Sequence, residues 1–325
     1  MNAPTPSPLQ RESPFHAGEI YVQTLAGSRD AMAEVGARVI RLAMPDQHRQ
    51  FFAQLPFLVV GALDAQAQPW ATLLSGAPGF AYSPDPALLR VNAFVPPTDP
   101  LHGALRPGAP LGLLGIEPST RRRNRVNGTI EAVDTQGFTL RVAQSFGNCP
   151  QYIRMRESTS QAHEAPPVAE PSQSSLDDDA QRQIASADTF FIATHYAGDG
   201  ATERSAGTDV SHRGGKPGFV RVENATTLVW PDFRGNSFYN TLGNLHVNPR
   251  AGMVFVDFAS GGFLHIAGDA EVLWHDDAQS GFEGALRLVR LRVREVRRVR
   301  GALPEVWRDG EASPSVERTG EWPAA

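Results

Sequence analysis

The 325-residue sequence contains one cysteine, Cys149, and one lysine, Lys216. A single cysteine excludes an intrachain disulfide framework, so we expect a cytoplasmic protein. No stretch approaches the roughly 18 apolar residues of a membrane-spanning helix, and residues 2–8 lack the apolar core of a signal peptide. The net charge of -5 is not the basic excess that holds a nucleic acid. We therefore expect neither a membrane nor a nucleic acid as partner, and expect a small molecule instead.

The composition favours two domains of ordinary size. Hydrophobic residues make up 41% of the chain, enough for one large core or two smaller ones. A segment near the middle is rich in Pro, Ser and acidic residues and cannot build a core of its own. The sequence predicts a tail (1–14), a first domain (15–156), a linker (157–175), a second domain (176–307) and a tail (308–325).

The two predicted domains repeat the same order of segments, which indicates an internal duplication. Their short strands and few helices predict a mainly β fold of two small tandem β-barrels. The paired segments, first half before second, are a helix (45–52 and 175–184), a strand (57–62 and 190–194), a Pro-Gly-Phe turn (78–80 and 217–219), a short helix (100–105 and 237–245) and two more strands (111–116 and 252–257; 127–133 and 267–272).

One strand-to-helix turn in the second half has the residues of a phosphate site. Arg234, Gly235, Asn236 and Ser237 follow an apolar strand, and Asn240 lies in the predicted helix. Free backbone N–H groups and the helix dipole favour an anion there, and arginine binds two phosphate oxygens at once. The alternative is a helix capped by Asn or Ser, with a surface arginine. The equivalent turn of the first half (95–100) has neither Arg nor Asn, so we expect one phosphate site.

The second half resembles the FMN-binding split-barrel family of pyridoxamine 5'-phosphate oxidase. The first half resembles the same fold more weakly, in the manner of a two-barrel branch. The matching segments are 209–220, 234–236, 263–272 and 287–300 in the second half, and 119–128 and 145–152 in the first. The resemblance implies two split β-barrels forming an intrachain pseudo-dimer, with one FMN per chain.

The resemblance also implies where FMN would lie. Its phosphate would contact Arg234, Asn236 and Ser237, and the edge of its ring would meet a segment of four residues, Ser211, His212, Arg213 and Gly214. Arg213 would stabilise negative charge on the ring or bind the phosphate; the alternative is a solvated hairpin residue.

Other residues complete the predicted site. Arg121, Arg123 and Arg125 would alternate on one strand face and supply a second wall from the first half; the alternative is a solvated face. Trp307 would cover the flavin or lie at the barrel rim. Cys149 is expected to be a packed thiol.

These features predict an FMN-dependent oxidoreductase that transfers a hydride at flavin N5 to or from a small molecule, with a separate electron donor or acceptor. The residues that clamp a phosphorylated substrate in that family are not found, so the vitamin B6 reaction is not predicted. No catalytic side chain is identified and no metal site is expected. The alternative is a non-catalytic flavin- or haem-binding protein, whose candidate axial ligands are His195, His212, His246 and His265. The sequence leaves homodimer formation open.

Overall fold

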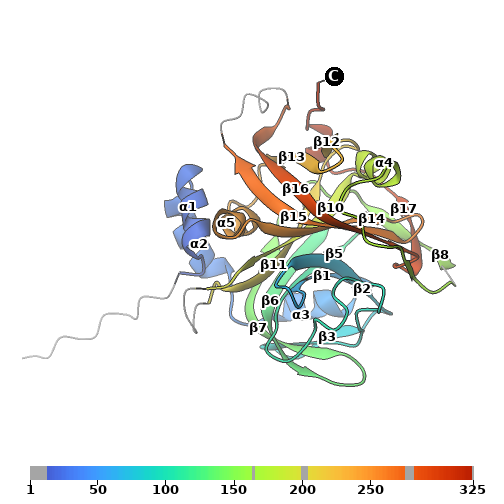
Figure 1. Cartoon of the computed structure of the whole chain (residues 1–325). Coiled ribbons are helices and arrows are strands. Elements are labelled where there is room, and N and C mark those ends of the chain that lie inside the picture. Colours follow the sequence, from blue (N-terminus) through green and yellow to red (C-terminus); the bar gives the residue numbers. More distant parts are fainter. Residues whose placement is uncertain (1–12, 163–164, 199–203, 275–281, 324–325) are drawn as a thin grey trace, which may run out of the picture.

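A computed structural model shows a mainly antiparallel β protein (Figure 1). It describes residues 13–162, 165–198, 204–274 and 282–323. Within these ranges, no helix combines the length and apolar character needed to cross a bilayer.

The first half forms a seven-stranded sheet preceded by helix α3 (Asp46–Ala53). The strands lie in the order β2-β1-β5-β6-β7-β4-β3. Their bounds are β1 (Phe57–Leu63), β2 (Pro69–Ser75), β3 (Ala81–Asp85), β4 (Leu88–Val91), β5 (Pro110–Glu117), β6 (Arg122–Val133) and β7 (Phe138–Asn148). Strand β1 is apolar throughout because its residues enter two cores: Leu58 and Val60 pack inside the barrel, and Phe57 and Val59 pack outside it.

The second half repeats this arrangement strand for strand. Helix α4 (Asp178–Ser186) precedes a path of seven strands in the order β11-β10-β14-β15-β16-β13-β12. Their bounds are β10 (Thr189–Tyr196), β11 (Gly207–Gly214), β12 (Arg221–Asn224), β13 (Thr227–Phe233), β14 (Arg250–Asp257), β15 (Gly262–Leu273) and β16 (Ala285–Arg300). The two strand orders correspond position by position: β2 to β11, β1 to β10, β5 to β14, β6 to β15, β7 to β16, β4 to β13 and β3 to β12. The predicted mainly β fold of two tandem copies is therefore confirmed.

The two barrels share a third hydrophobic core, between their outer faces. It combines residues such as Val59 and Leu114 of the first barrel with Phe191 and Val254 of the second. Each barrel also has a core of its own. The shared core fixes one barrel against the other, so residues from both can build one site.

Equivalent glycines allow the two barrels to approach closely. A Cβ atom on Gly112 would lie 2.5 Å from the carbonyl oxygen of Thr208, and one on Gly252 would lie 2.0 Å from that of Pro69. Thr208 lies on β11 and Pro69 on β2, its counterpart, so the contact is reciprocal, as at a two-fold interface. The chain therefore forms an intrachain pseudo-dimer.

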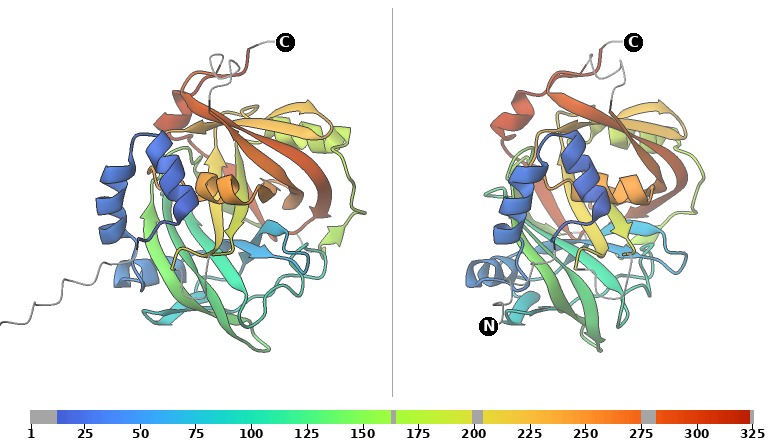
Figure 2. Two further views of the ribbon diagram at one scale, coloured as in Figure 1. Left: turned by 60° about the vertical axis from the view of Figure 1, so that its left-hand side comes forward. Right: turned by 90° about the vertical axis from the view of Figure 1, so that its left-hand side faces the viewer.

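Several segments differ from the expectations. Helices α1 (Ala17–Leu25) and α2 (Arg29–Val39) were not predicted. Figure 2 shows α1 beside helix α5 (Asn240–Val247). The predicted linker contains β9 (Val168–Ala169), which pairs with β16, and most of β8 (Arg156–Ala162), which pairs with β17 (Glu305–Asp309).

The predicted C-terminal tail contains regular structure and packs against the second barrel. It includes helix α6 (Pro314–Glu317), and the Trp322 indole donates a hydrogen bond to the Phe219 carbonyl at 3.0 Å. The N-terminal one falls mostly on residues 1–12, outside the described part of the chain.

The short helix predicted at 100–105 is wrong, because this segment is a series of turns. The Asp99 carboxylate accepts a hydrogen bond from the Leu101 N–H, which favours a turn. Gly103 has a φ of 74°, in the left-handed region, which a right-handed helix excludes.

Candidate functional site

A pocket opens at the junction of the two barrels, between β6, β11 and the turn that joins β13 to α5. Its empty space is about 860 Å³, including the part open to solvent. It is lined by most of the predicted binding residues: Arg123, Ser211, His212, Arg213, Gly214, Gly235, Asn236, Ser237 and Asn240. Arg123 comes from the first barrel and the others from the second.

Two predicted residues lie outside this lining. Arg234 is exposed, although its neighbour Gly235 lines the pocket. Trp307 lies on β17, where its ring packs edge-on against Phe57 at 5.7 Å and lines a separate hollow.

The turn before α5 differs from the prediction of a helix beginning at Ser237. Ser237 and Tyr239 have φ values of 61° and 60°, in the left-handed region, so the helix begins only at Asn240. The Asn236 side chain accepts a hydrogen bond from the Phe238 N–H at 3.2 Å and stabilises the turn. The first residues of α5, Asn240 and Thr241, line the pocket.

The predicted alternation of three arginines holds for two of them. Arg123 and Arg125 both line the pocket from β6. Arg121 precedes β6 with a φ of 62°, and its guanidinium donates to the carbonyl oxygens of Glu311 and Ala312. This left-handed residue ends the strand's alternation, so Arg121 is directed away from the other two.

The positive charges in the pocket differ in how they are balanced. Arg125 forms an ion pair with Asp209 at 2.9 Å, and Arg213 forms one with Asp232 at 3.0 Å. Asp232 is also 3.4 Å from Arg287. Asp209 and Asp232 are thus two carboxylates beside three arginines, and they cannot neutralise all three.

Arg123 has no acidic partner among the described residues. Its guanidinium donates to the Cys149 carbonyl, and its Nε atom is buried without a hydrogen-bond partner there. Burial, with repulsion from Arg125 and Arg213, lowers the pKa of Arg123 to about 9. The cost of a buried and crowded cation makes this pocket suited to an anionic ligand.

The imidazole of His212 is a neutral group in the pocket wall. It is buried and lies against the Phe191 ring, 5.7 Å between centroids. Burial and the charges of Arg123, Arg156 and Arg213 lower the pKa of His212 well below its ordinary value.

The other three candidate histidines have partners elsewhere. His195 is hydrogen-bonded to the Thr208 hydroxyl, His246 stacks on Tyr21, and His265 donates to the Ala71 carbonyl.

Aromatic and apolar groups line the rest of the pocket. Tyr152 and Phe233 stack with ring centroids 5.0 Å apart and an interplanar angle of 21°. Leu114 of the first barrel and Leu242 of α5 add apolar surface. The pocket thus combines cations and neutral donors with flat apolar groups, a lining that suits a planar ligand with an anionic group.

The corresponding place in the first barrel has different side chains. By strand register, Thr72 is equivalent to Ser211, and His265 of the second barrel is equivalent to Arg125. Thr72 donates a hydrogen bond to Asp99, whose carboxylate lies 3.7 Å from His265 Nε2. The side chains of Thr72, Asp99 and His265 are all buried.

Comparisons with known proteins give weak similarities. No family model and no curated protein matches the sequence. Among solved structures, HupZ from Group A Streptococcus is 14% identical, with 40% of this chain and 98% of that chain covered and a TM-score of 0.29. A candidate pyridoxamine 5'-phosphate oxidase from Lactobacillus delbrueckii is 19% identical, with 38% and 93% covered and a TM-score of 0.29.

A third similar structure is an FAD-binding protein from Mesorhizobium loti, which is 12% identical, with 39% and 97% covered and a TM-score of 0.24. At TM-scores this low, the similarities carry no argument about function.

Sequence reasoning missed part of the site. Cys149, expected only as a packed thiol, lines the pocket with Tyr152. Glu19, Asp209 and His16 form a buried polar network beneath it. The one local signal was the spacing of His16 and Glu19, which form the capping box of α1.

Proposed function

We propose that the pocket binds FMN and that the protein is an FMN-dependent oxidoreductase acting on a small molecule. The observation that carries this proposal is the Arg123 cation, which has no acidic partner among the described residues and lies beside Arg213 in a pocket that also has a flat apolar wall. A phosphate would neutralise that charge, and a planar ring would cover the wall.

The residues present fit FMN. Arg123 and Arg213 supply charged donors for the phosphate, and Asn236 and Ser237 supply neutral ones. Arg234, being exposed, would contribute from the rim of the pocket only.

The segment Ser211–Gly214, with Tyr152, would contact the ring. Bound FMN would supply hydride transfer at N5. The protein would orient it, limit water and hold positive charge near the ring, while His212 stays neutral.

The phosphate contact is tested by titrating the purified protein with FMN and with riboflavin, which lacks the phosphate. Loss of a charge-assisted contact corresponds to about tenfold or more in affinity, so FMN is expected to bind at least that much more tightly. Equal affinities in a flavin-fluorescence titration would show that the arginines do not bind the phosphate.

The redox role is tested separately, by adding NADH or NADPH to the FMN-loaded protein without oxygen. Loss of the flavin's visible absorption supports an oxidoreductase with a nicotinamide donor. A flavin that stays oxidised with both donors favours the second candidate function, a binding protein.

A haem-binding protein is the other form of that second candidate, because a neutral imidazole, that of His212, lines the pocket. A Soret band in the purified protein, with no flavin absorption, would favour haem over FMN.

A further inference from the structure

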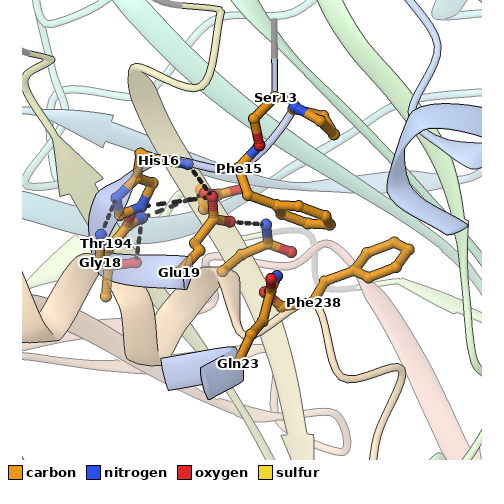
Figure 3. Close-up of polar contacts among 12 residues, drawn as sticks. Ser13, Phe15, His16, Gly18, Glu19, Gln23, Thr194 and Phe238 are labelled. Carbon is orange, nitrogen blue, oxygen red and sulfur yellow. Dashed lines mark hydrogen bonds and ion pairs between the residues drawn. The ribbon is translucent and has the colours of Figure 1, made fainter. Parts of the chain in front are cut away.

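Helix α1 places a buried carboxyl group directly beneath the pocket. Glu19 is only 2% exposed. One of its oxygens accepts a hydrogen bond from the His16 N–H at 2.9 Å, and the other accepts from the side-chain amide of Asn240. Figure 3 shows the Glu19 side chain directed from α1 toward His16 and the neighbouring polar groups. The N-terminal helix is thus connected to the first residue of α5.

Asn240 passes this contact on to the first barrel. Its amide oxygen accepts a hydrogen bond from Arg125 Nη1 at 3.1 Å, and Arg125 Nη2 donates to the Ser211 hydroxyl at 2.5 Å. Asn240, Arg125 and Ser211 all line the pocket. Because a guanidinium has only donors, the amide oxygen of Asn240 must face Arg125 and its NH2 group must face Glu19.

The neighbouring groups also fix the donors and acceptors of the His16 ring and the Asn244 amide. His16 Nδ1 accepts from the Gly18 N–H at 3.1 Å, so its Nε2 carries the proton that Asn244 Oδ1 accepts at 2.8 Å. The Asn244 NH2 group then donates to Asp209 at 3.2 Å, the same carboxylate that pairs with Arg125. The orientation of each amide is set by its neighbours.

We infer that α1 is part of the binding site and that Glu19 is a positioning residue, which fixes Asn240 and through it Arg125 at the base of the pocket. The inference rests on the proposed function, in that FMN is the ligand expected there. In either protonation state, both oxygens of Glu19 can accept a hydrogen bond. The side-chain nitrogen of a glutamine cannot accept a hydrogen bond. In a Glu19→Gln variant it would face another donor, the N–H of His16 or the NH2 group of Asn240.

The test compares Glu19→Gln with Val22→Ala. Val22 lies on the same helix, is 1% exposed and packs in the second barrel's core. Its side chain has no polar group, so it cannot form a hydrogen bond to Asn240. Its truncation loosens α1 by loss of apolar contacts alone. Each variant is titrated with FMN, and hydrogen–deuterium exchange of the 240–247 segment is measured in the ligand-free protein.

Glu19→Gln is expected to weaken FMN binding by about tenfold and to speed exchange in 240–247. Val22→Ala is expected to keep its affinity within about twofold of the original. The double variant Glu19→Gln/Asn240→Asp restores complementary pairing, so we expect slow exchange to return.

Unchanged exchange in Glu19→Gln, or equal losses of affinity in Glu19→Gln and Val22→Ala, would overturn the positioning role. If the unsubstituted protein fails to bind FMN, the proposed function fails. The exchange measurement then still tests Glu19 by itself, because it needs no ligand.

Discussion

Arg123 is the residue on which the proposed ligand chemistry depends most directly. The described residues give its guanidinium one carbonyl acceptor and no carboxylate, and burial lowers its pKa to about 9. A buried cation without an anionic partner destabilises the ligand-free protein. When an anion binds, the same cation adds to the binding free energy. Its effects on stability and on binding should therefore have opposite signs.

Arg123→Met is predicted to leave the free energy of unfolding of the ligand-free protein unchanged or to raise it by up to about 2 kcal/mol. The same substitution should weaken FMN binding by about tenfold or more, since a charge-assisted contact is lost. Chemical denaturation and FMN titration measure the two effects.

Arg122→Met is the matched control, because Arg122 is exposed and lies over the Phe51 ring, 5.1 Å from its centroid. It should bind FMN like the original protein. If Arg123→Met binds FMN equally well, Arg123 does not contact the phosphate.

Glu19 gives a prediction about pH. Burial and the charge of Asp209 raise the pKa of Glu19 well above its ordinary value of 4.5, against the lowering effects of Arg125 and the hydrogen bonds from His16 and Asn240. Between pH 4.5 and the raised pKa, the folded protein holds a proton that the unfolded chain has released. Stability contributed by this group is therefore lost as pH rises through that range.

The Glu19→Gln variant has no titrating group at this position, so above pH 4.5 its free energy of unfolding should fall less steeply with rising pH than that of the original protein. Urea denaturation at several pH values measures the two slopes. Parallel slopes would mean that Glu19 ionises in the folded state as it does in the unfolded chain.

At the scale of elements, helices α1 and α5 pack with their backbones in contact. A Cβ atom on Gly18 would lie 2.3 Å from the carbonyl oxygen of Gly243. Backbone cannot move aside as a flexible side chain can, so a methyl group there must separate the helices.

Gly18→Ala is therefore predicted to lower the free energy of unfolding by about 1 to 3 kcal/mol, as overpacking commonly does. Gly235→Ala is the control for stability, because its added Cβ would meet nothing within 4 Å and its φ is not in the left-handed region. Thermal unfolding of both variants checks this. Equal melting temperatures for the two would contradict the close packing of α1 on α5.

Elements with a local signal were predictable from the sequence. The apolar run that forms β10 and the acidic cap of α4 gave their positions within a few residues, because Asp177 accepts a hydrogen bond from the Ala180 N–H, as such caps do. The late start of α5 was not predictable. Left-handed backbone is usually indicated by glycine, and here it occurs at Ser237 and Tyr239.

The site was partly predictable for a similar reason. The site residues of the second barrel lie in short continuous segments of the sequence, and the family resemblance predicted them. Glu19 and Asp209 come from segments 190 residues apart, and their contacts with Asn240 and Arg125 arise only when α1 packs on α5 and the barrels pair. No local pattern indicates such a network.

At the scale of the whole molecule, the duplication is symmetric in topology and asymmetric in chemistry. The strand orders agree, yet the pocket has Arg125 and Ser211 where the other copy has His265 and Thr72. At the second position, Thr72 and His265 are buried and both face Asp99. One chain should therefore provide one complete binding site, built from both barrels.

The amount of FMN bound per chain shows directly whether the chain has one complete site or two. Saturating the purified protein with FMN, removing the excess and measuring flavin and protein concentrations gives the ratio. We predict one FMN per chain. Two per chain would show that the equivalent position in the first barrel also binds a ligand, and one per two chains would show that the site needs a second copy. Either result would contradict this prediction.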